Sequence, residues 1–298
     1  MSSSFAIEHP EAGARPSVPA WVWLLGPYIL LLVGGLLAPL ANLTVLSMLR
    51  YDPQSIWLLE VTGQNYARLT DEYYASVLIR TLRIGLITTV FCLLLGMPLA
   101  YWLARCSRSL LATGLFLVVM PMMVSTVIRA FGWMILLGRN GVINGLSVEL
   151  GLGRWLFIMN TETAVIIALV QLMLPLVVLP TMAAIEKIPL SLEEAATNLG
   201  AGPFALFRRV VLPLASPGLA SGALLCFVVS ISVVVTPALM GGRGSRMIGN
   251  EIYDQVITAM NWPFASAMAV VLIVLVTGLL VVSFWLGRLI APVASKAR

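Results

Sequence analysis

The chain has 298 residues, of which 60% are hydrophobic and only 10% are charged. A soluble domain usually carries roughly 25% charged residues, so this composition excludes a protein that is solvated on all sides. The net charge of +5 is spread over loops and span ends. We therefore interpret the basic residues as topology determinants and lipid contacts, and we expect no nucleic-acid partner.

Six stretches without Asp, Glu, Lys or Arg reach the ~18 residues that suggest a membrane span. They are residues 16–49, 84–104, 110–128, 163–185, 214–242 and 255–287. The remaining loops are too short for a soluble domain of ordinary size. The sequence therefore predicts an all-α integral membrane protein with six transmembrane helices.

The first 20 residues lack the basic leading region and cleavage site of a signal peptide, so we expect a flexible cytoplasmic tail. The six-span domain should follow over residues 21–289, and residues 290–298 should form a second cytoplasmic tail. The apolar run from Trp21 is too long for a signal-peptide core and predicts an uncleaved first span. The loop at about Arg50–Arg80 should contain the largest segment outside the membrane.

The other five spans are predicted near Ile84–Ala104, Leu110–Leu137, Thr163–Ile185, Pro217–Met240 and Phe264–Leu289. Only five residues separate the second span from the third, so these two should form an antiparallel hairpin. With both termini inside, nine Lys and Arg residues face the cytoplasm and eight face outward. That difference is too small to fix the orientation.

The segment between the fourth and fifth spans predicts two short helices joined by a sharp turn. Ser191 and Glu194 have the spacing of a capping box at the start of the first helix. Gly200 suits the left-handed residue that ends a helix, and Pro203 suits the first turn of the next one. Because helices this short are unstable alone, the segment must pack against its own spans or a partner.

Each of these two helices has an apolar face. In the first helix that face consists of Leu192, Ala195, Ala196 and Leu199, and in the second it consists of Phe204, Phe207 and Val211.

The same segment resembles the EAA loop of ABC importer permeases. The residues that carry this resemblance are Glu194, Ala195, Ala196, Gly200, Val210, Leu212 and Pro213. Valine at 210 replaces the isoleucine that is common in the family. The resemblance implies that residues 188–213 form a cytoplasmic coupling loop, with Ser191 at its start, that seats in a groove of an ATPase subunit. It also implies the type I ABC importer permease architecture, with a core region of about residues 77–287.

Shorter matches resemble the spermidine/putrescine-type permeases, specifically the first permease of each pair. They are Asn65-Tyr66, residues 95–101, residues 185–189, residues 239–242, residues 248–250 and residues 262–264. The family implies a second, homologous permease, an ABC ATPase dimer and an extracytoplasmic substrate-binding protein, assembled in the bacterial cytoplasmic membrane. The chain has no G-x-x-x-x-G-K-[ST] phosphate loop, so we expect no cofactor here and ATP-Mg in the ATPase.

Carboxylates and aromatic rings near the outer ends of the spans are candidates for a substrate path or a binding-protein contact, because ammonium groups favour both. Glu251 and Asp254 share a face if their segment is helical. They could equally be ordinary solvated residues. The candidates are Glu162, Glu251, Tyr253, Asp254 and Trp262.

Arg129 is the one ionisable residue inside a predicted apolar stretch. It should lie near one interface, where we expect it either to snorkel or to make a structural contact with a carbonyl group. A permanently positive group there would also oppose a cationic substrate.

Three alternatives to a polyamine importer remain at this stage. The chain could serve an ABC importer of another small organic solute. A secondary carrier or channel is less favoured, since no acidic residue lies deep in a span and no internal repeat appears. An enzyme is disfavoured because no acid, base, nucleophile or metal-binding set converges.

Overall fold

The computed structural model describes residues 20–153 and 157–290, and their regular structure is helical apart from one β-hairpin. Most of both predicted tails lies outside these residues. The elements are α1 (Ala20–Ser47), β1 (Leu49–Asp52), β2 (Ile56–Val61), α2 (Gln64–Leu69), α3 (Glu72–Arg105), α4 (Arg108–Met123), α5 (Thr126–Leu137), α6 (Val142–Glu149), α7 (Glu162–Glu186), α8 (Leu190–Asn198), α9 (Pro203–Leu206), the π-helix η1 (Phe207–Val211), α10 (Leu212–Ser232), α11 (Val235–Met240), the 3-10 turn η2 (Arg243–Ser245), α12 (Ile248–Ile257) and α13 (Trp262–Ile290).

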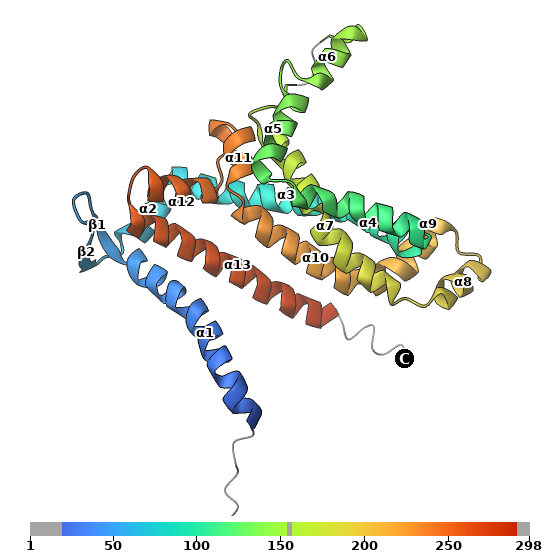
Figure 1. Cartoon of the computed structure of the whole chain (residues 1–298), viewed down its shortest axis with the longest axis horizontal. Coiled ribbons are helices and arrows are strands. Elements are labelled where there is room, and N and C mark those ends of the chain that lie inside the picture. Colours follow the sequence, from blue (N-terminus) through green and yellow to red (C-terminus); the bar gives the residue numbers. More distant parts are fainter. Residues whose placement is uncertain (1–19, 154–156, 291–298) are drawn as a thin grey trace, which may run out of the picture.

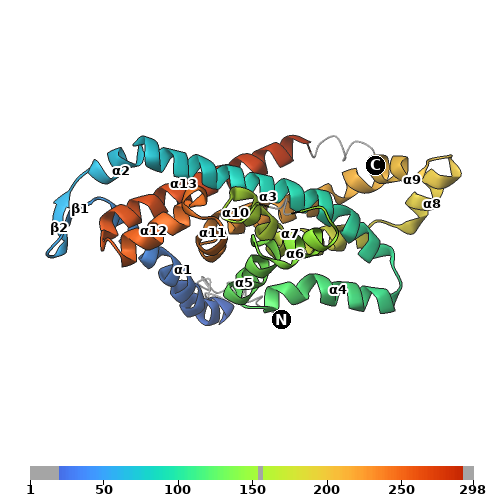
Figure 2. The same cartoon turned by 90° about the horizontal axis from the view of Figure 1, so that it is seen from above.

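The molecule is an elongated helical bundle with different structures at its two ends (Figure 1). The β-hairpin and α2 lie at one end, which we call the hairpin end, and α8 lies at the other, which we call the α8 end; Figure 2 shows the same separation from above. Helices α3, α7 and α10 pack against one another and form the core. Two clusters of buried apolar side chains fill this core along its length.

Small residues allow α7 and α10 to approach closely. A Cβ atom at Gly218 would lie 2.6 Å from the carbonyl oxygen of Pro180, and one at Gly222 would lie 2.9 Å from the Cα of Val177. These glycines are four residues apart, so they share one face of α10 and let the two backbones meet. Larger side chains at either position would force the helices apart.

Five helices are long and apolar enough to cross a membrane, and α4 with the α5–α6 segment gives a sixth span if the bent pair is counted as one. The predicted helical membrane fold with six spans is therefore confirmed. The second span is longer than predicted, because α3 begins at Glu72 and runs for 34 residues. Such a helix is roughly 50 Å long, so it exceeds the ~30 Å hydrocarbon layer and continues into what was expected to be loop.

Two predicted spans are broken rather than continuous. In the third, Val124 and Ser125 are not helical, and the chain bends by 101° between α4 and the Thr126–Glu149 segment. In the fifth, α10 ends at Ser232 and α11 begins at Val235. Because of the second break, Pro237 lies in the first turn of α11. The N–H groups of a first turn have no acceptor within the helix, so a proline there breaks no helical hydrogen bond.

The sequence did not predict the β-hairpin, which lies in the first loop, where β1 and β2 pair antiparallel. Two residues noted in the sequence hold it to the end of α1. The buried Asn65 side chain donates hydrogen bonds to the carbonyl oxygens of Ser47 and Leu49, both at 2.9 Å. Tyr66 Oη lies 2.7 Å from Ser47 Oγ. The Asn65-Tyr66 pair thus has a structural role in positioning the hairpin.

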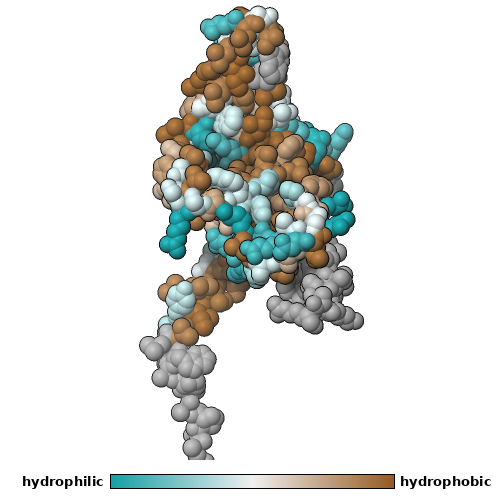
Figure 3. Space-filling model, turned by 90° about the vertical axis from the view of Figure 1, so that its right-hand side faces the viewer, coloured by the Kyte–Doolittle hydropathy of each residue, from teal (hydrophilic) through white to brown (hydrophobic). Residues whose placement is uncertain are grey.

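Much of the apolar surface faces outward. Figure 3, seen from the α8 end, shows polar residues gathered at the centre and hydrophobic surface on the parts projecting above and below. These parts are the α5–α6 arm and α1, which meets α13 near the hairpin end and then diverges from it (Figure 1). On α1, Leu30 and Leu31 are each 77% exposed. Surfaces of this kind require lipid or another apolar helix as neighbours.

Candidate functional site

The segment between α7 and α10 forms the two short helices that the sequence predicts, but its first cap differs. Helix α8 begins at Leu190, with Pro189 as the N-cap residue and no side-chain capping bond. Ser191 is therefore already inside the helix, and the predicted capping box with Glu194 is wrong. Pro189, with a ψ of 133°, lies just outside the helix, so α8 begins at Leu190, one residue before Ser191. Ser191 and Glu194 are both exposed.

The turn after α8 matches the prediction for Gly200. Its φ is +87°, in the left-handed region. The Gly200 N–H donates to the carbonyl of Thr197 at 2.9 Å, and the Ala201 N–H donates to the carbonyl of Ala196 at 3.0 Å. This pair of bonds is the Schellman arrangement, which satisfies carbonyl groups at the end of a helix.

The second short helix begins with Pro203 at its first turn, as predicted, and continues through η1 into α10. Pro213 has no N–H for the carbonyl four residues earlier, and its ring would crowd that carbonyl. The π-helical turn η1 lies over this part of the chain and accommodates the proline. Val210 is partly buried here, whereas Leu212 is 38% exposed.

The predicted apolar faces of α8 and α9 are largely uncovered. Leu192, Leu199 and Phe204 are 47%, 89% and 75% exposed. In the second helix Val211 is buried, and Phe207 packs edge-on against Tyr101 with ring centroids 5.9 Å apart. One side of the segment is thus fixed to the bundle, and the other offers apolar side chains to a partner outside the chain.

Sequence reasoning missed the residue that fixes α8 to the bundle, which is Glu193. This side chain is buried, and its Oε1 accepts hydrogen bonds from Arg105 Nε at 3.0 Å and from Arg105 Nη2 at 2.5 Å. Tyr101 Oη donates to Oε2 at 2.9 Å. Arg105 Nη2 also donates to the carbonyls of Ile185 and Ile188. The ends of α3 and α7 and the start of α8 therefore meet at one ion pair.

A signal for this pair existed in the sequence. Arg105 ends a span, and a charge at that position needs either water or a counter-ion. The adjacent acids Glu193 and Glu194 lie in helical sequence, so they point in different directions and cannot serve the same contact. The family pattern identified Glu194, and nothing local distinguished the inward-facing neighbour.

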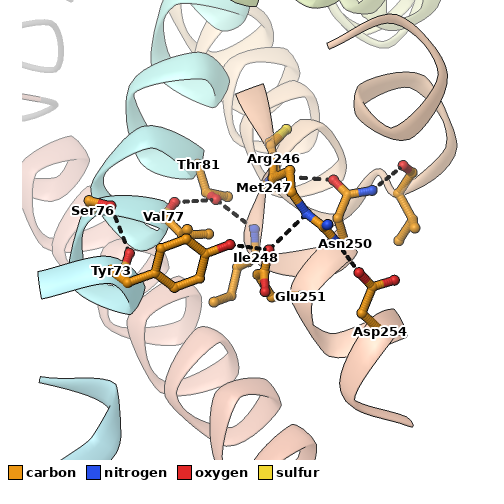
Figure 4. A network of polar contacts seen from close by, with 11 residues as sticks. Tyr73, Ser76, Val77, Thr81, Arg246, Met247, Ile248, Asn250, Glu251 and Asp254 are labelled. Atoms are coloured by element: carbon orange, nitrogen blue, oxygen red, sulfur yellow. Dashed lines mark hydrogen bonds and ion pairs between the residues drawn. The ribbon is translucent and has the colours of Figure 1, made fainter. Parts of the chain in front are cut away.

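A second polar cluster lies at the hairpin end, around α12 (Figure 4). Glu251 is only 5% exposed. Its Oε1 lies 2.8 Å from Arg246 Nε and accepts a hydrogen bond from Tyr73 Oη at 2.9 Å. Arg246 also forms an ion pair with Asp254. The hydrogen bond to Asp254, opposed by burial, raises the pKa of Arg246 above its ordinary value.

Hydrogen bonds between side chains and backbone groups hold α12 in place beside this cluster. The Ile248 N–H donates to Thr81 Oγ1 of α3 at 2.8 Å. Asn250 accepts from the Met247 N–H through Oδ1 and donates through Nδ2 to the carbonyl of Val234, in the break before α11. Tyr73, Thr81 and Asn250 thus join α12 to both α3 and α11 (Figure 4).

A cavity of about 630 Å³ lies next to this cluster. The polar part of its lining consists of five side chains. The apolar part consists of residues of α11, residues of the break before α11, and Val127 of α5. The five are Arg243, Arg246, Asn250, Tyr253 and Asp254. A cavity of this size could hold a small organic solute.

The structure does not bring all the sequence candidates together. Glu251, Tyr253 and Asp254 share α12, as a helical segment implies. Glu162 instead pairs with Arg80 and Arg83 of α3, at 3.3 and 2.6 Å. Trp262 packs on Trp57 of the hairpin, with ring centroids 5.8 Å apart. Neither Glu162 nor Trp262 lines the cavity, so their role in a substrate path or a binding-protein contact stays a prediction.

Arg129 makes the carbonyl contact that the sequence predicts. Its Nη2 donates to the carbonyl of Val124 at 3.2 Å and to Thr126 Oγ1 at 3.3 Å. Both acceptors lie at the break between α4 and α5. The guanidinium group therefore donates a hydrogen bond to a backbone carbonyl that has lost its helical partner at the bend.

Comparisons with known proteins place this architecture among transport proteins. Residues 81–296 match the family described as binding-protein-dependent transport system inner membrane component. The spermidine/putrescine transport system permease protein PotB of Haemophilus influenzae is 37% identical over 252 residues, covering 84% of this chain and 88% of its own. The corresponding protein of Escherichia coli is 36% identical over 249 residues, covering 83% and 90%.

Solved structures agree on the fold. One chain of a bacterial alginate ABC transporter, solved in complex with its alginate pentasaccharide-bound periplasmic protein, matches with a TM-score of 0.72 and 19% identity. The match covers 91% of this chain and 94% of that one. At this identity the match establishes the permease fold and says nothing about the solute.

Proposed function

This chain belongs to the family of inner membrane components of binding-protein-dependent transport systems, and we propose that its ABC importer carries polyamines such as spermidine and putrescine into the bacterial cytoplasm. The observation that carries the substrate class is the identity of 36–37% to two spermidine/putrescine permeases over more than four fifths of the chain. The chain is a multi-pass inner membrane protein. Its own contribution is half of the path across the bilayer.

The coupling role belongs to residues 188–213, in which α8, the Gly200 turn, α9 and η1 form one compact unit. The exposed side chains of Leu192, Leu199 and Phe204 support docking of this unit in a groove of the ATPase. The ion pair between Arg105 and Glu193 joins the unit to α3 and α7. Movement of the docked α8 would therefore pass directly into two core helices.

The remaining partners follow from the same assignment. A second, homologous permease would complete the translocation path, and an ABC ATPase dimer would bind ATP-Mg. An extracytoplasmic binding protein would deliver the solute to the hairpin end. At that end Asp254 and Tyr253 line the 630 Å³ cavity and offer a carboxylate and an aromatic ring to ammonium groups.

Uptake by the purified complex tests the function. The two permeases and the ATPase should be reconstituted in liposomes, with saturating binding protein and labelled spermidine. We expect labelled spermidine to accumulate only when ATP is present, and we expect unlabelled putrescine to inhibit this uptake. Uptake that continues without the ATPase would instead identify a carrier or channel. ATP-dependent uptake of a different solute, with none of spermidine, would keep the importer and reject the polyamine.

The orientation is a separate prediction, in which both termini, the 105–109 turn and the coupling loop face the cytoplasm. Thr70 directly follows α2 and Ala201 lies between α8 and α9, and these elements lie at opposite ends of the bundle (Figure 1). Single cysteines at these positions, in a chain lacking Cys92, Cys106 and Cys226, should react with an impermeant reagent from opposite sides. We expect Thr70→Cys to react in intact cells and Ala201→Cys only after the membrane is opened. Reaction of both from outside would refute this orientation.

A further inference from the structure

Arg246 already occupies the place where a cation would bind at the hairpin end. It lies between Glu251 and Asp254, which are three residues apart on one face of α12 (Figure 4). Glu251 is 5% exposed, so its carboxylate requires a positive partner inside the protein. The two acids and the arginine carry a net charge of −1. The cluster is therefore an acidic site filled by the protein's own guanidinium group.

The two ion pairs of Arg246 differ in how firmly they are held. Glu251 is buried and also accepts a hydrogen bond from the hydroxyl of Tyr73 on α3. Asp254 has a side chain that is 40% exposed, and it lines the 630 Å³ cavity together with Arg246. Arg246 donates a hydrogen bond to Asp254, whereas its contact with Glu251 is an ion pair without a hydrogen bond. Because Asp254 is open to the cavity and Glu251 is buried, Asp254 is the carboxylate that a second cation can reach.

We propose that Arg246 is an internal counter-ion that an ammonium group of the transported solute displaces from Asp254. The inference rests on the proposed import of polyamines. Exchange of one cation for another keeps Asp254 paired throughout and leaves Arg246 beside the buried Glu251. An alkylammonium group donates hydrogen bonds to carboxylates as a guanidinium does, and it can reach Asp254 from the cavity. Solutes without a positive group cannot make this exchange, so the site selects for amines.

Displacement of Arg246 also affects the helix contacts. Arg246 precedes α12 and is bound to two of its side chains, so it orders the start of that helix. The adjacent contacts of Ile248 with Thr81 and of Glu251 with Tyr73 attach α12 to α3. Release of Arg246 would loosen this attachment at the moment a cation arrives. The same residue therefore couples solute recognition to the opening of the hairpin end.

Basal ATP hydrolysis by the complete importer, measured without binding protein or polyamine, tests the role of Arg246. The variant Arg246→Ala should hydrolyse ATP about fivefold faster than the wild type, as expected for the loss of one partly buried ion pair. Arg246→Lys retains a cation and should remain close to the wild type. The matched control is Arg50→Ala, because Arg50 forms an exposed ion pair with Glu60 in the β-hairpin and does not line the cavity. Equal basal rates for all four proteins would overturn the proposal.

Chemical rescue tests the exchange itself. Millimolar guanidinium or methylammonium should return the basal rate of Arg246→Ala toward the wild-type value, whereas sodium chloride at the same ionic strength should not. Failure of both organic cations would show that the site does not accept them and would refute the exchange. Rescue does not require polyamine transport, so it separates this inference from the proposed function. Absence of spermidine uptake by the wild type would reject only the polyamine assignment.

Discussion

Replacing Gly200 with valine is expected to abolish solute uptake while the protein still inserts in the membrane and pairs with its second permease. Gly200 has a φ of +87°, and no neighbouring atom would lie within 4 Å of an added Cβ. The cost is therefore a backbone cost of at least about 1–2 kcal/mol, and it is larger for a β-branched residue. This energy is too small to unfold a six-span bundle. It is sufficient to break the Schellman turn and misplace α8 relative to α9.

Asparagine at the same position provides the matched control. Gly200→Asn adds a side chain to the same exposed turn, but asparagine tolerates the left-handed conformation better than any β-branched residue. We expect Gly200→Asn to keep most uptake and ATPase retention. Membrane insertion, pull-down of the ATPase, ATP hydrolysis and uptake should be measured on one preparation of each variant.

The outcomes separate three explanations for the Gly200 result. Loss of uptake in Gly200→Val but not in Gly200→Asn supports a backbone effect on the coupling loop. Equal loss in both would indicate that any side chain there blocks docking. Wild-type behaviour of Gly200→Val in all assays would show that the turn is a simple connector, and it would remove the main support for α8 as the coupling element.

The number of spans could be read from the sequence, but their continuity could not. Apolar run length reports the number of bilayer crossings because each crossing needs a similar length of hydrocarbon. It does not report backbone direction. Val124 and Ser125 sit in a run as apolar as its surroundings, yet the chain turns there by 101°. Arg129 was the available sign, since its guanidinium group serves the carbonyl that this bend frees.

The site shows a similar division between local and tertiary information. Gly200 and Pro203 were predicted correctly because their roles depend on their own backbone conformations. The cap at Ser191 was wrong because Pro189, two residues earlier, decided where α8 begins. The roles of Glu193 and Arg246 depend on contacts with residues far away in the sequence, including Tyr73 and Arg105. Such pairings cannot be inferred from the spacing of neighbouring residues.

Breaking the ion pair between Arg105 and Glu193 is expected to destabilise the permease itself, in contrast to the effect at Gly200. The two side chains are 18% and 10% exposed, and removing one leaves the other buried without its counter-ion. Breaking a pair of this kind costs about 3 kcal/mol or more. Glu193→Gln and Arg105→Met should each lower the melting temperature of the purified permease by roughly 5 °C or more.

A double-mutant cycle distinguishes a specific pair from general damage. The double variant should be destabilised by clearly less than the sum of the two single variants, because the second change removes the charge that the first left unpaired. Exposed neighbours provide the controls, namely Glu194→Gln beside Glu193 and Arg108→Met beside Arg105. Both should melt close to the wild type. Additive losses in the cycle would show that the two side chains act independently.

Substitutions in the Arg105–Glu193 pair should lower both uptake and stability, whereas a substitution at Glu194 should not lower stability. Because Arg105 Nη2 also holds the carbonyls of Ile185 and Ile188, its loss frees the end of α7 as well as α8. Arg105→Met should therefore lower both melting temperature and uptake, whereas Glu194→Gln should weaken ATPase retention at unchanged melting temperature. The contrast follows from the directions of the two adjacent side chains on α8. Glu193 points toward the bundle, and Glu194 points toward the partner. If Glu194→Gln instead destabilised the isolated permease, the inward and outward roles assigned to these two acids would be reversed.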